Sequence, residues 1–339
     1  MRKRFDRDRV TAILFLTPSI IAIFIFVYGF IMWTGWVSMI KWNDIAQIPK
    51  GSLVPDVDFA GFQNYVRLLT TDARFKIDLR NTVVFTITFI AGCLTLGLGL
   101  AVLLDQKIKG EGVYRSIFLF PMAISFIVTG VVWRWMLNPG NQSSGPVGVN
   151  QLLENLGLGF LQSAWYTNPE VVFIAPASTL GQFLSRLGLG ALASPQFGIP
   201  LAILSVVIAA MWQMSGYTMA MYLAGLRGIP EELREAARVD GATEFEVYRY
   251  IILPLMQPIT LSVVIILGHI SLKIFDLVSA MTGPGPAFAT DVPAYYMFDT
   301  VFRGNHFSSG AAIAIILLIS VAVLVIPYLV NNMRSEASQ

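Results

Sequence analysis

The polar side chains that could bind a small ligand lie inside long apolar stretches of the sequence. They are Trp212, Gln213, Ser215 and Tyr217 in one stretch and His269, Ser271, Lys273 and Asp276 in another. A charged side chain at membrane depth costs free energy unless it is shielded, so each such residue deserves a functional hypothesis. Tyr and Trp suit a sugar, because their apolar faces cover C–H groups while their polar edges bind hydroxyls.

Each group also has a purely structural interpretation. Lys273 and Asp276 are three residues apart and could pair on one helix face. Such a pair would either line a ligand pathway or simply neutralise itself against a neighbouring helix. An aromatic residue in a membrane span more often packs or lies at the interface than binds a ligand, so Trp212 alone is weak evidence for binding. Both alternatives stay open at this point.

Catalytic and metal-binding motifs are absent from the sequence. There is no GxxxxGK[ST], HExxH, CxxC or GxSxG, so the phosphate-binding loop of an ATPase is missing. His269 and His306 are the only histidines and Cys93 is the only cysteine, which excludes a disulfide framework. We therefore expect no enzyme activity, metal or cofactor in this chain. Nor does any basic patch indicate nucleic-acid binding.

The elements that carry these residues are predicted to be membrane-spanning helices. Of the 339 residues 55% are hydrophobic and 13% are charged, against about 25% charged in soluble domains. A run of 18 or more apolar residues can cross about 30 Å of hydrocarbon as a helix. Six runs qualify, at about 11–37, 81–104, 117–137, 199–225, 257–280 and 309–330. The sequence thus predicts an all-α polytopic membrane protein with about six spans, in which Asn81 and Asn138 cap helix ends.

The distribution of lysine and arginine predicts the orientation. Thirteen of them lie in 1–10, 105–116, 226–256 and 331–339, and eight lie in the much longer 38–80, 138–198 and 281–308. By the positive-inside rule both termini are cytoplasmic. Residues 138–198 are then an external insertion, with one or two short amphipathic helices. The apolar part at 171–192 is not expected to be a seventh span, since Arg186 and Pro176 interrupt it.

Residues 226–256 form a polar segment between two apolar runs, here called the coupling segment. Pro230, Glu231 and Glu232 predict the start of a helix over 231–239, and Gly241 predicts its end. Thr243 and Glu246 form a capping box for a second helix, which Pro254 should break. In the first helix, helical spacing places one narrow face of residues together, namely Leu233, Ala236, Ala237 and Asp240. We interpret the segment as a helical hairpin to which another protein docks.

Its fixed positions resemble a known signature. Glu235-Ala236-Ala237, three residues, Gly241, nine residues and Ile251-x-Leu253-Pro254 are similar to the EAA motif of ABC importer permeases. FAGFQNYVRLL (59–69), residues 114–140, residues 211–242 and LKIFDLVSAMTGPGP (272–286) resemble carbohydrate permeases of the maltose and glycerol-phosphate type. LDQKIKGEGVYRSIFLFPMA and VPAYYMFDTVF look closest to the glucose/mannose branch.

The resemblance implies a type I ABC importer permease fold in the cytoplasmic (inner) membrane. Residues 1–80 would form an N-terminal helix and an external segment, and residues 81–339 the transmembrane core. The implied partners are a second homologous permease, two ATPase subunits that bind ATP and Mg, and an extracytoplasmic sugar-binding protein, with lipid around the spans. The implied coupling residues are Glu235, Ala236, Ala237, Asp240, Gly241, Leu253 and Pro254. The implied pocket-facing residues are Ser271, Lys273 and Ile274.

Some features depart from the family or favour other functions. The family has Gly-Gly-Pro where this chain has Gly283-Pro284-Gly285-Pro286, and residues 174–198 look like an insertion. The expected substrate is glucose, mannose or a related small sugar or glycoside. A disaccharide or glycerol phosphate is an alternative. An ion-coupled secondary transporter is another, although it would need inverted repeats and an ion relay, for which Lys273 and Asp276 are the only candidates.

Overall fold

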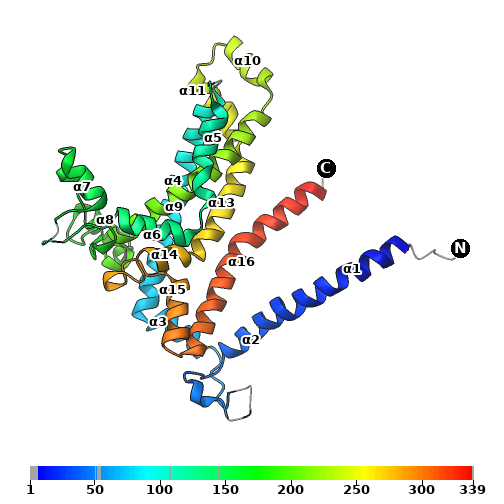
Figure 1. Cartoon of the computed structure of the whole chain (residues 1–339), viewed down its shortest axis with the longest axis vertical. Helices are drawn as coiled ribbons and strands as arrows, with labels where there is room; N and C mark the ends of the chain where they lie inside the picture. The colour runs from blue at the N-terminus through cyan, green and yellow to red at the C-terminus, as the bar shows by residue number, and fades with distance from the viewer. Residues whose placement is uncertain are drawn as a thin grey trace. The chain divides into compact units, whose positions relative to one another are not determined.

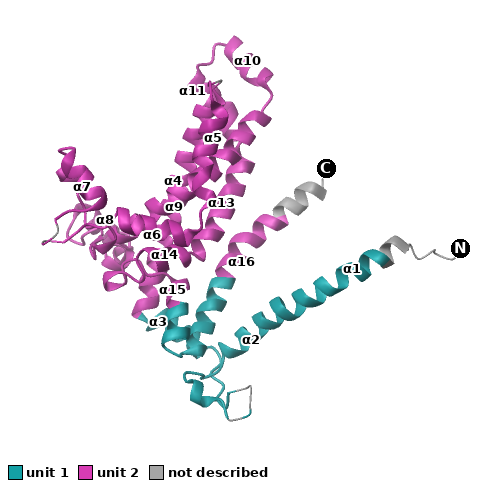
Figure 2. Ribbon diagram, viewed as in Figure 1, with its two compact units in different colours: residues 1–72, 297–318 teal, residues 73–296, 319–339 magenta. Residues whose placement is uncertain are grey.

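The computed structural model describes residues 7–49, 51, 55–106, 108–141, 143 and 145–337. Helices make up most of this part of the chain (Figure 1). Its one sheet pairs two short antiparallel strands, β1 (Val171–Val172) and β2 (Ile199–Pro200). Two compact units are distinguished (Figure 2): residues 1–72 with 297–318, and residues 73–296 with 319–339.

The first unit begins with a continuous helical rod. It consists of α1 (Arg7–Ile23), a π-helical stretch (Phe24–Gly29) and α2 (Phe30–Val37). The side chains of residues 11–30 are exposed all around it. A helix that is apolar on every side and exposed on every side suits lipid rather than water. The predicted first span, 11–37, is confirmed in its length and composition.

After this rod the chain folds back on the beginning of α16 (Phe307–Ala337). Trp42 stacks on Phe307, with ring centroids 4.5 Å apart, and its backbone N–H donates to Ser308 Oγ at 2.7 Å. Asn64 of α3 (Gln63–Thr70) donates to two backbone carbonyls nearby. A 3-10 turn (Ile45–Gln47) and a π-helical turn (Asp299–Arg303) complete the unit.

The second unit is built on α4 (Ala73–Asp105), α9 (Leu201–Gly228) and α13 (Gln257–Leu272). Fully buried side chains from all three helices make its core: Phe85, Phe89 and Cys93 from α4, Ile203, Val206 and Ala210 from α9, and Val263 and Leu267 from α13. Helix α4 starts eight residues before the predicted run. Asn81 therefore lies inside the helix, and the prediction that it caps a helix end is wrong. Its Nδ2 donates instead to the carbonyls of Phe288 and Asp291, each at 2.8 Å.

The apolar run 117–137 is a bent pair of helices rather than one straight span. The first half is α5 (Glu111–Leu119) with a 3-10 turn (Phe120–Ala123), and the second half, α6 (Phe126–Met136), lies at 98° to it. Pro121 has no N–H for a helical bond, and Ile124 is extended. Ser125 then caps α6, with its Oγ accepting from the Val128 N–H at 3.3 Å. Hydropathy detects the run but not this bend.

The apolar run 257–280 is also broken. Helix α13 ends at Leu272, Lys273 leaves the helical conformation with φ −117° and ψ 26°, and α14 (Asp276–Met281) begins again. Before α13 lie α11 (Glu244–Val247), a π-helical stretch (Tyr248–Ile252) and α12 (Leu253–Leu255). The segment Glu244–Leu255 meets α13 at a bend of 63°. The bend follows Leu255, one residue after the predicted break at Pro254, and Pro254 itself lies inside α12. Among the described residues four helices are long and apolar enough to cross a membrane, and six if each bent pair counts as one span.

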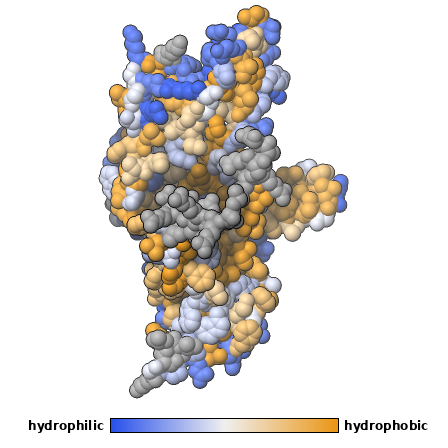
Figure 3. Space-filling view, turned by 90° about the vertical axis from the view of Figure 1, so that its right-hand side faces the viewer, coloured by the Kyte–Doolittle hydropathy of each residue, from blue (hydrophilic) through white to orange (hydrophobic). Residues whose placement is uncertain are grey.

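Residues 138–198, which the sequence predicts to be an external insertion, hold only short elements among the described residues. These are α7 (Gly148–Asn155), α8 (Thr179–Arg186), β1, and 3-10 turns at Gly159–Leu161, Trp165–Thr167, Gly190–Leu192 and Pro195–Phe197. The prediction that 171–192 forms no long span is confirmed. Helix α10 (Glu231–Val239), a 3-10 turn (Pro286–Phe288) and α15 (Pro293–Phe298) complete the list of elements. In Figure 3 hydrophilic side chains gather at the upper end, where α10 lies in Figure 1, and hydrophobic side chains are frequent on the coloured surface below it.

Candidate functional site

The coupling segment folds as the predicted helical hairpin. Helix α10 ends at Val239, and Gly241 turns the chain at φ 87°, a conformation that costs glycine little. Thr243 Oγ1 accepts from the Glu246 N–H, while the Glu246 carboxylate accepts from the Thr243 N–H at 2.7 Å. Both the first helix and the capping box are thereby confirmed. The hairpin outlines a protruding loop at one end of the second unit (Figure 1).

One face of α10 is anchored to its own chain. Arg234 Nη1 donates to Asp105 Oδ2 at 2.8 Å, at the end of α4, and Nη2 donates to the Leu226 carbonyl at 2.9 Å, near the end of α9. The Arg234 and Asp105 side chains are 11% and 12% exposed. Ala237, one turn on from Arg234, is buried in a cluster with Leu104, Leu226, Val247, Ile252 and Met256. The hairpin is therefore tied to the ends of two long helices.

The opposite face of α10 is free in the described structure. Glu235, Ala236 and Asp240 are exposed, and Val239 and Phe245 beside them are 87% and 70% exposed. The sequence placed Leu233, Ala236, Ala237 and Asp240 on a single docking face. This is wrong for Ala237. Arg234 faces the bundle, and Ala237, three residues further along the helix, lies on the same face as Arg234. The two alanines of the motif thus differ in environment: Ala237 is buried, whereas Ala236, about 100° further round the helix, is exposed.

One exposed ion pair crosses the turn of the hairpin, and a second lies along α10. Arg238 Nε lies 2.7 Å from Glu244 Oε1, and Arg238 Nη1 lies 3.6 Å from Glu231 Oε1. The hydrogen bond from Arg238 lowers the pKa of Glu244. Hydrogen bonds from the backbone and then the side chain of Thr243 likewise lower the pKa of Glu246. Both carboxylates therefore stabilise the hairpin in their charged form.

The polar residues of α9 have different environments. Gln213 is buried, and its Nε2 donates to the Ile124 carbonyl at 2.6 Å, in the bend between α5 and α6. Trp212 is partly exposed and meets Trp133 edge to face, with centroids 6.0 Å apart. Ser215 is partly exposed, and Tyr217 packs against the core. Gln213 is thus tied into the helix packing, while the other three lie at or near the surface.

The polar residues around the break after α13 are also divided. Ser271 is buried between two helices, since its Oγ accepts from Thr86 at 2.9 Å and donates to the Gly268 carbonyl at 2.8 Å. Ile274 is buried in the core, and His269 is partly buried. Lys273 and Asp276 are exposed and lie on either side of the break. The prediction that they share one helix face is therefore wrong, and these two described side chains form no ion pair with each other.

Sequence reasoning missed a polar cluster at the start of α4. Arg74 Nε lies 2.6 Å from Asp291 Oδ2, whose side chain is fully buried. The Arg74 guanidinium also lies over the Phe288 and Tyr296 rings, at 4.7 and 4.4 Å. Arg74 and Asp291 are 217 residues apart in the sequence, so no local pattern indicates the pair. The cluster fixes the loop after α14 against α4.

The sequence comparisons agree with this architecture. Residues 93–335 match the family described as the inner membrane component of binding-protein-dependent transport systems. A probable ABC transporter permease of Pyrococcus horikoshii is 38% identical over 98% of this chain and 99% of its own length. The xylose/arabinose import permease of Haloferax volcanii is 34% identical over 83% of this chain and 77% of its own length. The trehalose/maltose permease MalF of Thermococcus litoralis is 29% identical over 95% of this chain and 94% of its own length.

Solved structures support the same fold. A bacterial ABC transporter that imports alginate has a chain that superposes with a TM-score of 0.69, over 99% of both chains at 19% identity. The same kind of transporter in complex with its pentasaccharide-bound periplasmic protein gives a TM-score of 0.70, over 96% and 94% at 20% identity. The chain belongs to the inner membrane components of binding-protein-dependent transport systems and is an ABC transporter permease subunit with the type I importer fold.

Proposed function

We propose that this permease forms half of the translocation pathway of an ATP-driven sugar importer in the cytoplasmic membrane. The other half would be a second, homologous permease. Two separate ATPase subunits would bind ATP and Mg, and an extracytoplasmic binding protein would deliver the sugar. The observation that carries the proposal is that the coupling hairpin has two different faces. Arg234 and Ala237 anchor one face of α10 to the helix bundle, and Glu235 and Ala236 are exposed on the other face.

This arrangement suits the transmission of force. A docked ATPase subunit would hold the outer face of α10, with Glu235 making polar contacts and Ala236 permitting close approach. Gly241 turns the hairpin, and Leu253 and Pro254 connect it to α13. Movement of the docked subunit would pass through Arg234 and the buried cluster to α4 and α9, and the pathway would alternate between its outer and inner openings.

A neutral sugar is the proposed cargo. The exposed or partly exposed candidates for the pathway are Trp212, Ser215, Tyr217, His269, Lys273 and Asp276, while Gln213, Ser271 and Ile274 would support them from within the packing. Named relatives carry xylose and arabinose, or trehalose and maltose, which supports a sugar as cargo. Glucose or mannose remains our first candidate. An ion-coupled secondary transporter is disfavoured, because the chain belongs to the permeases of binding-protein-dependent ABC transporters.

The test is uptake by the purified transporter in proteoliposomes, with radiolabelled glucose, mannose, xylose, maltose and trehalose. We expect uptake of at least one sugar only when ATP is inside the vesicles and the binding protein is outside. Uptake driven by an ion gradient without ATP would refute the proposal. Selective uptake of a disaccharide would refute only the glucose or mannose assignment.

A further inference from the structure

The external insertion has unusually few charges for a segment that lies outside the helix bundle. Among residues 138–198 only Glu154, Glu170 and Arg186 are charged. This fraction is far below the roughly 25% of charged residues in soluble domains. Large apolar side chains are nevertheless exposed along it. A surface of this kind marks a site of interaction rather than a solvated face.

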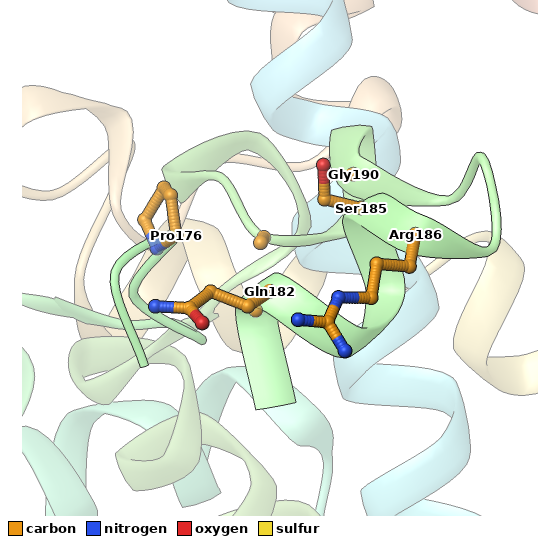
Figure 4. A pocket seen from close by; sticks show the side chains of 7 residues that line it. Pro176, Gln182, Ser185, Arg186 and Gly190 are labelled. Atoms are coloured by element: carbon orange, nitrogen blue, oxygen red, sulfur yellow. The ribbon is translucent and has the colours of Figure 1, made fainter. Parts of the chain in front are cut away.

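Helix α8 separates its apolar and polar residues. Leu180, Phe183 and Leu187 follow one another at helical spacing on one face, and each is more than half exposed. On the other face Gln182, Ser185 and Arg186 line a cavity of about 330 Å³ (Figure 4). The apolar face therefore points away from the rest of the insertion, where nothing in the described structure covers it.

A second apolar group lies around α7. Leu152, Leu156, Phe160 and Leu161 are each at least half exposed, Phe160 by 80%. Hydrogen bonds hold them in place: Asn150 Nδ2 donates to the Ser163 carbonyl at 2.9 Å, and Asn150 Oδ1 accepts from the Trp165 indole at 2.8 Å. The exposure thus belongs to a fixed fold and not to a loose loop.

The chain on both sides of the insertion belongs to membrane-spanning segments. It leaves α6 at Met136 and enters α9 at Leu201, and Figure 1 shows α7 and α8 to one side of α4 and α9, with α8 next to α6. The exposed apolar groups thus lie in a segment that is joined at both of its ends to apolar spans. From this connection and the scarcity of charge we propose that α7 and α8 rest their apolar faces in the outer leaflet of the membrane.

Lipid fits these faces better than the binding protein does. A binding protein that docks and leaves would expose Phe160, Phe183 and the leucines to water in every cycle, whereas lipid covers them at all times. An interfacial element buries its apolar face about 5–10 Å into the boundary of head groups and acyl chains. With only one arginine, the attraction would come from apolar burial rather than from anionic lipid.

Spin-label accessibility in lipid nanodiscs tests the proposal on the full chain with its copurified partner subunits. A Cys93→Ala background removes the only thiol of this chain, and the chain is labelled before it is assembled with its partner subunits. Phe183→Cys and Leu156→Cys carry a nitroxide on the apolar faces, and Ser185→Cys, on the cavity face of α8, is the matched control. We expect the ratio of oxygen to water-soluble nickel-chelate collisions to be several-fold higher at 183 and 156 than at 185.

Three results would overturn the proposal. Equal, water-like ratios at all three positions would mean that the faces are solvated. Low accessibility to both reagents at 183 and 156 would mean that another subunit covers them. Protection that arises only when the binding protein is added would make the faces its docking surface. Since the readout does not depend on transport, failure of the sugar assay would leave this test intact.

Discussion

Replacement of Arg234 with methionine tests whether the coupling hairpin is fastened to the bundle from the inside. Methionine keeps most of the aliphatic volume but removes the donors to Asp105 and to the Leu226 carbonyl. A hydrogen bond to a charged group contributes about 1.5–3 kcal/mol, and an unpaired buried charge costs more. Because both side chains are nearly nine-tenths buried, we expect a loss of about 3 kcal/mol.

The assay is thermal unfolding of the purified permease, followed by its transport activity in proteoliposomes. Arg238→Met is the matched control, because Arg238 pairs with Glu244 and Glu231 at the exposed edge of the same helix and should change the midpoint little. We expect Arg234→Met to lower the midpoint by several degrees and to reduce transport, and Asp105→Asn to recover part of that loss in the double variant. Equal midpoints for the two arginine variants would refute the reasoning.

Three further predictions concern the bundle and the hairpin. Asn81→Leu should destabilise the fold by about 2–3 kcal/mol, because the carbonyls of Phe288 and Asp291 lose their donor; chemical unfolding in detergent measures this, and an unchanged midpoint would contradict it. Gly216→Ala should impair folding, since the added Cβ would overlap the Phe118 carbonyl. Gly99→Ala places its Cβ in open space and should leave the free energy of unfolding unchanged or raise it by up to about 1 kcal/mol. The same unfolding assay compares the two variants, and an equal loss of stability in both would contradict the prediction. Since the pKa of Glu244 is lowered in the folded hairpin, its stabilising contribution should be complete above the ordinary pKa of an unfolded glutamate and be lost as the pH falls through the lower folded value. Hydrogen exchange of residues 231–247 at graded pH measures this loss. Arg238→Met should remove the part that depends on Glu244 and leave the part that depends on Glu246, and an unchanged pH dependence in that variant would contradict the prediction.

Local sequence signals predicted the coupling hairpin well. Pro230, Gly241 and the Thr243–Glu246 box each act within a few residues, so their effect depends little on the rest of the fold. The apolar runs predicted the membrane helices for a similar reason, since the length needed to cross a bilayer is a property of one segment.

Features that depend on distant partners could not be predicted in this way. Asn81 looked like a helix cap because its true partners, the carbonyls of Phe288 and Asp291, lie 207 and 210 residues away. Hydropathy carries no information on the direction of the backbone, so it cannot predict the bend after Ala123 or the break at Lys273. Helical spacing shows which residues of α10 share a face, but not which face packs against the bundle. The ion pair between Arg234 and Asp105 sets that orientation, and Ala237 is buried as a result.

The central claim is that movement of an ATPase drives this permease through the exposed face of α10. ATP hydrolysis by the reconstituted transporter, stimulated by sugar-loaded binding protein, measures it most directly. We compare the wild type with Glu235→Lys, and use Glu170→Lys, a charge reversal at an exposed residue of the insertion, as the control. We expect Glu235→Lys to abolish stimulated hydrolysis and uptake, and Glu170→Lys to retain both. Uptake that persists without any ATPase subunit, or equal activity of the two variants, would contradict it.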